Sequence, residues 1–86
     1  MPWDLFYTKR ANRDLLRIPY NERQIILHSL EKVIVDFQIS DIKKLSGRKN
    51  EWRIRVGKWR AILQFNYEDG IIRVLRILPR KDAYRD

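Results

Sequence analysis

The spacing of the apolar residues changes halfway along this chain, and this change constrains the fold more than any other feature. In the first half, Ala11, Leu15 and Ile18 recur at the spacing of one helix face. From residue 51 onward, apolar and polar side chains alternate, as in a half-buried strand. A chain of 86 residues has room for one small core. The two patterns together predict the α+β class, with helices packed on a sheet.

Two helices are expected before residue 38. The first is capped by Thr8 and ends ahead of Pro19, which disfavours helical geometry in the residue before it. The second begins at Asn21, where Gln24 completes a pattern like the capping box. Its main apolar positions form one stripe: Ile26, Leu30, Val33 and Phe37. Because only two residues separate these helices, we expect an antiparallel helical hairpin.

We expect one strand before the helices and three after them: residues 3–7, 51–56, 59–67 and 71–78. Gly57-Lys58 and Glu68-Asp69-Gly70 provide the turns between the last three strands. Residues 38–49 form a basic connector with Gly47 as its turn point. The predicted order is β-α-α-β-β-β, an N-terminal strand and a helical hairpin packed on an antiparallel sheet. Residues 1–86 form a single domain.

Several function classes are excluded by composition. There are no cysteines, which removes disulfides, zinc ribbons and thiol chemistry. The single histidine, His28, lies on the polar flank of the second helix and is expected to be structural. No metal-ligand spacing or glycine-rich phosphate loop is present, so we expect no metal and no cofactor. No apolar run is long enough to span a bilayer, and we expect a cytoplasmic domain without a signal peptide.

The positive charge is concentrated in one window of the chain. The formal net charge is +8. Residues 1–42 balance their acids and bases, whereas residues 43–60 contain Glu51 as their only acid. The basic residues of that window are Lys43, Lys44, Arg48, Lys49, Arg53, Arg55, Lys58 and Arg60. Such a concentration indicates a site for a polyanion such as a nucleic acid.

Three arginines of this window are expected to converge. Arg53 and Arg55 alternate with apolar residues, so they share one strand face about 7 Å apart, close to the spacing of successive phosphates. Arg60 follows across the Gly57-Lys58 turn. The alternatives are an ordinary solvated sheet face and an Arg60 that pairs with Glu51. Clustered guanidinium groups repel one another unless an anion joins them, which favours a binding site.

The segment after Pro79 offers two further candidates. Arg80 can contact a phosphate and Tyr84 can stack on a base. The alternative is that this segment only fastens the tail to the body of the domain. Trp3 and Trp52 are expected in the core, whereas Trp59 fits either a core or a base-stacking role.

Four motifs in order resemble the RelE/ParE toxin superfamily. The run Trp52–Ile62, WRIRVGKWRAI, is similar to the family pattern of an aromatic-basic segment followed by glycine, an aromatic residue and arginine. Lys43-Lys44-Leu45-x-Gly47 resembles its K-L-x-G connector. The first helix and the closing strand with its tail also match: Thr8–Ala11, Leu15–Pro19, Val74–Ile77 and Arg80–Arg85. The resemblance covers nearly the whole chain.

The resemblance implies the toxin of a type II toxin–antitoxin pair that cuts mRNA in the ribosomal A site. In such toxins the 2′-hydroxyl attacks the adjacent phosphate without a metal. By position, Arg53 and Arg55 match the family's paired basic residues, Arg60 the transition-state arginine, and Arg80 the leaving-group arginine. Tyr84 matches the base-stacking tyrosine. The remaining basic residues of the window are expected to bind RNA: Lys43, Lys44, Arg48, Lys49 and Lys58.

One departure from the family pattern bears on the chemistry. Better-studied members often have lysines where this chain has Arg53 and Arg55. A lysine can lose its proton among other cations and act as a base, whereas an arginine does not. We therefore expect slower cleavage, or proton transfer through ribosomal RNA. The alternatives from other classes are a ParE-like inhibitor of DNA gyrase and an RNA-binding module without activity.

The expected partners follow from the same resemblance. They are the 70S ribosome with its mRNA, and a cognate antitoxin that is acidic and partly disordered when free. We expect the antitoxin to cover the face that carries Arg53 and Arg60. Neither a membrane nor a small-molecule cofactor is expected among the partners.

Overall fold

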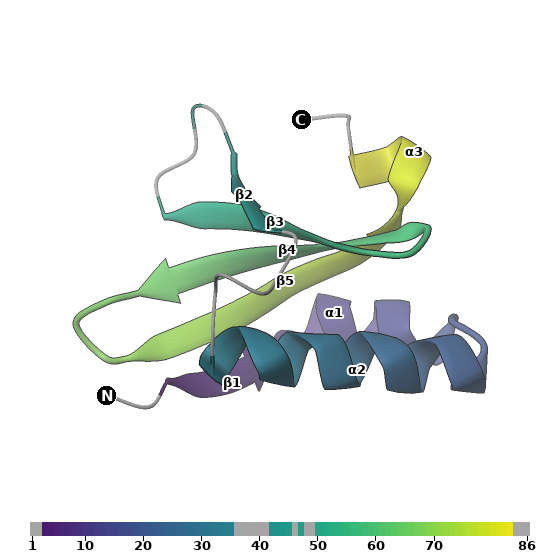
Figure 1. The fold of residues 1–86 in the computed structure, drawn as a ribbon, viewed down its shortest axis with the longest axis horizontal. Helices are drawn as coiled ribbons and strands as arrows, with labels where there is room; N and C mark the ends of the chain where they lie inside the picture. Colours follow the sequence, from purple (N-terminus) through teal and green to yellow (C-terminus); the bar gives the residue numbers. More distant parts are fainter. Residues whose placement is uncertain (1–2, 36–41, 46, 48–49, 84–86) are drawn as a thin grey trace.

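A computed structural model describes residues 3–35, 42–45, 47 and 50–83, with the side chains of 82 and 83 left out. The elements are β1 (Asp4–Tyr7), α1 (Lys9–Leu16), α2 (Tyr20–Val35), β2 (Ile42–Lys44), β3 (Glu51–Val56), β4 (Trp59–Asn66), β5 (Ile71–Pro79) and α3 (Arg80–Ala83). Figure 1 shows α1 and α2 below one face of the sheet, with α3 on the other side, at the end of β5. The α+β class and the predicted order of elements are confirmed.

The sheet is mixed and has five strands in the order β1-β5-β4-β3-β2. Strands β2 to β5 pair antiparallel, whereas β1 pairs parallel with β5. The sequence predicted neither this parallel edge nor β2, which lies within the predicted connector. Glycines with positive φ occupy the predicted turns, with φ values of 73° at Gly47, 57° at Gly57 and 67° at Gly70.

The start of α1 was predicted correctly and the start of α2 was not. The Thr8 hydroxyl accepts from the backbone N–H of Ala11 at 3.1 Å, as expected for an N-cap. At α2, the carbonyl of Pro19 already accepts from the N–H of Arg23 at 2.9 Å. The helix therefore begins at Tyr20, and Asn21 lies in its first turn instead of capping it. Phe37, predicted on the apolar stripe of this helix, lies outside the described residues.

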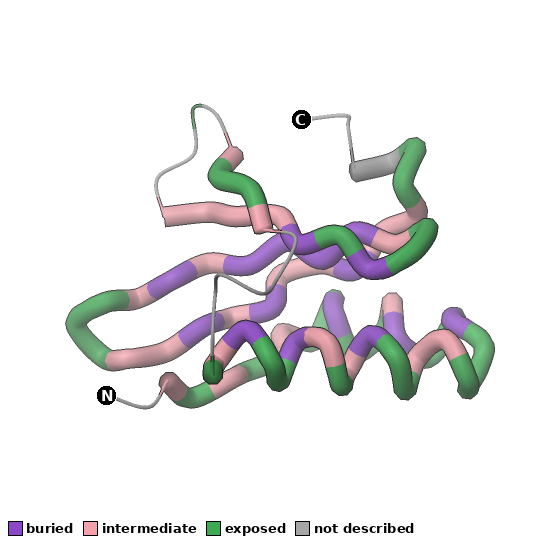
Figure 2. Tube along the Cα trace, in the orientation of Figure 1, coloured by how far each residue is buried: buried purple, intermediate pink, exposed green. Residues whose placement is uncertain are grey.

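The core lies between the helices and one face of the sheet. Apolar side chains from α1, α2 and the three long strands meet there, and the other sides of the helices are exposed (Figure 2). Ile26, Leu30, Leu63, Ile72 and Val74 are at most 1% exposed. Within the described residues, no helix has the length and apolar character needed to cross a membrane.

The edge of β5 is completed by α1 beyond the end of β1. The backbone N–H of Thr8 donates to the carbonyl of Val74 at 3.1 Å, and its hydroxyl donates to the carbonyl of Leu75 at 3.0 Å. Further along α1, Asp14 Oδ2 accepts from the backbone N–H of Ile77 at 2.9 Å. Side chains of α1 therefore satisfy backbone groups that a longer β1 would otherwise have paired.

Candidate functional site

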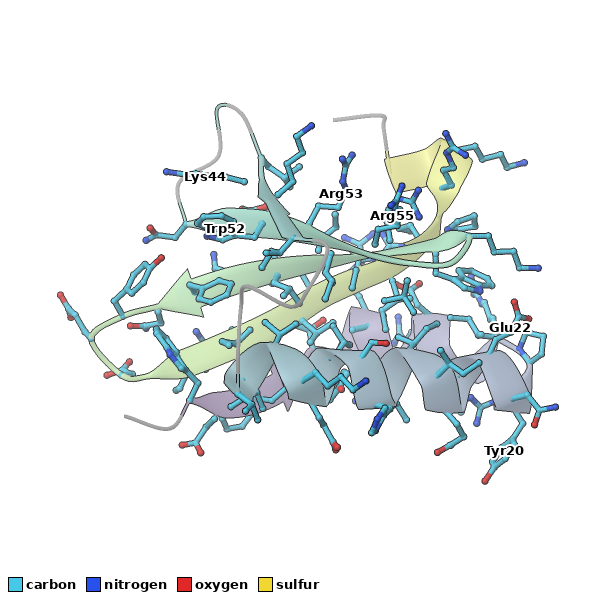
Figure 3. The ribbon with its side chains drawn as sticks, in the orientation of Figure 1. Tyr20, Glu22, Lys44, Trp52, Arg53 and Arg55 are labelled. Atoms are coloured by element: carbon cyan, nitrogen blue, oxygen red, sulfur yellow. The ribbon has the colours of Figure 1, made fainter. Side chains whose placement is uncertain are left out.

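The side of the sheet away from the helices carries the predicted basic residues of β3. Arg53 and Arg55 project from β3 away from α1 and α2, as Figure 3 shows. Ile54 and Val56, which alternate with them, are buried in the core. The alternation in the sequence therefore predicted the orientation of this strand correctly.

Strand register brings further basic residues to the same face. Arg55 lies directly opposite Arg60 of β4, and Arg53 lies opposite Lys43 of β2. Residues in such pairs share a face, with Cβ atoms about 4.5–5.5 Å apart. The predicted convergence of Arg53, Arg55 and Arg60 is thus present in the register. Glu51 lies opposite Gln64, towards the other end of β4, so the alternative pairing of Arg60 with Glu51 is not supported.

Arg60 is buried, which its residue type did not predict. It is 2% exposed and is the one charged residue among the buried side chains of the described part of the chain. Its Nη1 donates to the carbonyls of Gly57 at 2.9 Å and Trp59 at 2.8 Å. Its buried Nε has no hydrogen-bond partner among the residues that the structure describes. A buried guanidinium donor without a partner costs free energy, so a phosphate oxygen within reach of this group would stabilise it.

Arg80 lies at the same end of the sheet as Arg55 and Arg60. Its backbone N–H donates to the carbonyl of Lys58 at 2.8 Å, which fastens the start of α3 to the β3–β4 turn. The register supports this placement, because Arg60 lies opposite Leu78 and Trp59 opposite Pro79. The Arg80 side chain is exposed. The structure therefore positions Arg80 beside the turn that precedes Arg60.

The other predicted RNA-binding residues are divided. Lys44 is exposed, but it lies opposite Trp52 and so does not share a face with Arg53. Lys58 turns towards α2, where its Nζ lies 3.3 Å from Glu22 Oε1. Three predicted site residues lie outside the described residues: Arg48, Lys49 and Tyr84.

Glu22 is a contributor that the sequence reasoning missed. In addition to its ion pair with Lys58, its Oε1 accepts from Trp59 Nε1 at 3.2 Å. Glu22 thereby links the first turn of α2 to the β3–β4 turn, whose carbonyls hold Arg60 and Arg80. No local sequence signal reveals this contact, because 37 residues separate Glu22 from Trp59.

This face is suited to binding phosphates and to stabilising negative charge. Guanidinium groups bind phosphate oxygens through paired hydrogen bonds and keep their charge near neutral pH. Among the described residues, no group of three or more His, Asp or Glu side chains is arranged to hold a metal ion. The chemistry that Arg53, Arg55 and Arg60 bring to this face is that of cations and hydrogen-bond donors.

Comparison with known proteins identifies the class. The family model described as ParE toxin of type II toxin-antitoxin system, parDE, matches residues 5–84. The chain belongs to this family of type II toxin–antitoxin toxins. It is a toxin of the RelE/ParE superfamily, as the motifs predicted.

Individual relatives agree with this assignment. Toxin RelE3 of Methanocaldococcus jannaschii is 33% identical over 93% of each chain. The crystal structure of a RelB-RelE antitoxin-toxin complex from Methanococcus jannaschii contains a chain 30% identical, with a TM-score of 0.76, covering 93% of this chain and 95% of that one. The archaeal RelE-RelB complex of Pyrococcus horikoshii has the same fold, with a TM-score of 0.78 over the full length of both chains at 24% identity.

Proposed function

We propose that this toxin is an endoribonuclease that cuts mRNA in the A site of the ribosome. The observation that carries the proposal is the register of β3 and β4, which places Arg53, Arg55 and Arg60 on one face. Arg80 stands at the end of that face. Relatives of this chain are named RelE toxins, and the motif resemblance to that group includes the same arginines.

In the proposed reaction, the 2′-oxygen of one nucleotide attacks the adjacent phosphorus and the 5′-oxygen of the next nucleotide leaves. The products are a 2′,3′-cyclic phosphate and a free 5′-hydroxyl. Arg53 orients the attacking hydroxyl, and Arg55 neutralises the phosphate. Arg80 donates a hydrogen bond to the leaving 5′-oxygen, which takes up a proton from water to become the hydroxyl, and Tyr84 stacks on the substrate base. Arginine does not act as a base, so we assign removal of the 2′ proton to ribosomal RNA.

Arg60 has to change its hydrogen bonds to take part. Its Nη1 is engaged by the carbonyls of Gly57 and Trp59. A phosphorane carries more negative charge than the ground-state phosphate, and so competes for this guanidinium most strongly in the transition state. The proposed role of Arg60 is therefore selective stabilisation of the transition state.

The proposed macromolecular partners are the ribosome with its mRNA and a cognate antitoxin. The relatives from Methanococcus jannaschii and Pyrococcus horikoshii were crystallised with RelB antitoxins. An acidic, partly disordered antitoxin segment would complement the face formed by Lys43, Arg53 and Arg55. An antitoxin bound to that face would prevent RNA from reaching it.

A second candidate function is inhibition of DNA gyrase without catalysis. Two observations favour it: the matching family model is that of ParE toxins, and Arg60 is folded inward onto its own turn. A gyrase inhibitor needs a binding surface but no transition-state group. Both candidate functions are compatible with this fold, so the fold alone does not distinguish between them.

The deciding experiment maps the 5′ ends of a reporter mRNA after incubation with purified protein, with and without 70S ribosomes. We expect cuts within codons only when ribosomes are present. Arg55→Gln, at an exposed position, should reduce the cleavage rate by about 100-fold, whereas Lys32→Gln on the outer side of α2 should cut like the parent. Absence of cuts in both tubes, with inhibition of gyrase supercoiling in a parallel assay, would establish the second candidate instead.

A further inference from the structure

A second basic surface lies on the helix side of the molecule, along α1. Arg10, Arg13 and Arg17 follow one another at positions i, i+3 and i+7, so they share one side of the helix. All three are exposed. Together with Asp14 and Arg76 they line a hollow of about 180 Å³. This hollow lies where α1 meets the β5 edge of the sheet, and neither Arg53 nor Arg55, which point away from the helices (Figure 3), lines it.

The acid in this hollow is already engaged. Asp14 Oδ2 accepts from Arg76 Nε at 2.9 Å, and Oδ1 accepts from Arg76 Nη2 at 3.2 Å. Asp14 Oδ2 also accepts from the backbone N–H of Ile77. Within the described residues, Arg10, Arg13 and Arg17 form no ion pair. These three like charges are therefore left to repel one another, and a bound polyanion would relieve the repulsion.

The hollow continues towards the candidate site. An adjoining hollow of about 260 Å³ shares Asp14, Arg17 and Arg76 with the first. Its other lining residues are apolar or aromatic: Ile18, Trp59, Ile77, Leu78 and Pro79. The two hollows form one groove, which we call the α1–β5 groove, and it ends at Pro79, the residue before Arg80. A basic rim over an apolar, aromatic floor is typical of grooves that follow single-stranded nucleic acid.

We propose that the α1–β5 groove binds the sugar–phosphate backbone of single-stranded RNA. Arg10, Arg13 and Arg17 contact successive phosphates, and the half-buried Trp59 contacts a sugar or base where the groove approaches Arg80. An acidic protein segment fits less well, because it would match the rim and leave the aromatic floor without a partner. The inference rests on the proposed function only in taking RNA as the polymer.

The test measures the affinity of the full chain for a fluorescent 2′-O-methyl oligouridine, which has no 2′-hydroxyl to attack. Anisotropy titrations at increasing KCl give the salt dependence of binding. The variant Arg13→Gln/Arg17→Gln should bind about 10-fold more weakly at moderate salt, and its log–log slope should fall by about 0.7 for each lost phosphate contact. The matched control Lys32→Glu lowers the net charge by the same two units at an exposed position outside the groove, and should keep the parental slope. Thermal melts check that all variants fold.

Two results would overturn the proposal. If the groove variant and the Lys32→Glu control lose the same affinity and slope, the effect is one of net charge and the groove has no special role. If poly-glutamate displaces the oligouridine as effectively as unlabelled RNA of equal charge, the surface serves an acidic protein. Because the probe is not cleavable, a protein that binds through the groove but cuts no mRNA would refute the proposed function and support the groove. Unchanged binding by the groove variant of a protein that cuts mRNA would refute the groove alone.

Discussion

On the helix side of β3 and β4, Ile54 and Leu63 are 2% and 0% exposed. One residue along each strand, Arg53 and Gln64 belong to the opposite face, which carries charged and polar side chains together with Ile62. The two faces share their backbone and their register. The difference shows how a small domain separates two demands: alternate residues of the same strand serve the core and the binding surface. Substitutions one position apart should therefore have different consequences.

The largest effect on stability is expected from the core face. Leu63→Ala leaves a cavity between the sheet and the helices and should lower the free energy of unfolding by about 2–5 kcal/mol. Gln64→Ala, on the other face, should cost less than about 1 kcal/mol. Urea unfolding followed by tryptophan fluorescence measures both. Equal losses for the two variants would contradict the division between the faces.

The next effect concerns Asp14, whose side chain is 10% exposed and joins α1 to β5. Asp14→Ala removes the partner of Arg76 and the acceptor for the Ile77 N–H, so stability should fall by about 2–3 kcal/mol. Asp14→Asn keeps an acceptor for that N–H and should lose less. If the two variants are equally destabilised in urea, the backbone contact contributes nothing.

Glu22 should have a smaller effect that reaches the basic face through the turn. Glu22→Ala removes the acceptor for Trp59 Nε1 and the partner of Lys58, and should cost about 1 kcal/mol. Glu22→Gln retains the hydrogen bond from Trp59 Nε1 and should cost only a few tenths of a kcal/mol. Hydrogen exchange of the Arg80 amide, which donates to the Lys58 carbonyl, should be faster in Glu22→Ala than in Glu22→Gln. Equal exchange rates of this amide in the two variants would mean that Glu22 does not stabilise the turn that holds Arg80.

Tyr7 provides a pH-dependent test of the core side. Burial, with a further contribution from the negative charge of Glu31, raises the pKa of Tyr7 to about 12 from 10.0. The folded state thus retains a proton that the unfolded state releases between these pH values, so stability falls as the pH rises from about 10 to about 12. Tyr7→Phe removes this contribution. In thermal melts, the difference in Tm between the two proteins should stay nearly constant below about pH 10. Above about pH 10, the Tm of the wild type should fall more than that of Tyr7→Phe.

Arg55 should have the smallest effect on folding. Its side chain is exposed, so Arg55→Gln should change the free energy of unfolding by less than about 0.5 kcal/mol. Urea unfolding beside the cleavage assay would then show a folded but impaired protein. A large loss of stability in this variant would mean that the basic face also supports the fold.

Local patterns were enough to predict most elements. The helical spacing of Ala11 and Leu15, the alternation through Arg53 and Arg55, and the turn at Gly70 each specify an element within a few residues. Strand β2 was not predicted, because a segment of three residues, two of them lysine, is too short to show an alternating pattern. The cap at Asn21 was wrong because the carbonyl of Pro19 starts the helix earlier.

The site was less accessible to sequence reasoning, because its key contacts join distant segments. The shared face of Arg53 and Arg55 follows from period two, and the proximity of Arg60 follows from a two-residue turn. The burial of Arg60 depends on carbonyls of that turn folding beneath its side chain, which residue type does not indicate. The contact of Glu22 with Trp59 depends on how α2 lies under the sheet.

The parallel pairing of β1 with β5 also determines when the chain can finish folding. Asp4 lies beside Ile71 and Tyr7 beside Val74, so the first strand waits for the last one to be synthesised. Contacts this far apart in sequence slow folding, because the loop must close before they form. A toxin with this topology would therefore remain incompletely folded while most of it is still being translated. The topology delays assembly of the sheet until β5 has been synthesised. The arginines that the sheet positions are therefore brought together only at that stage.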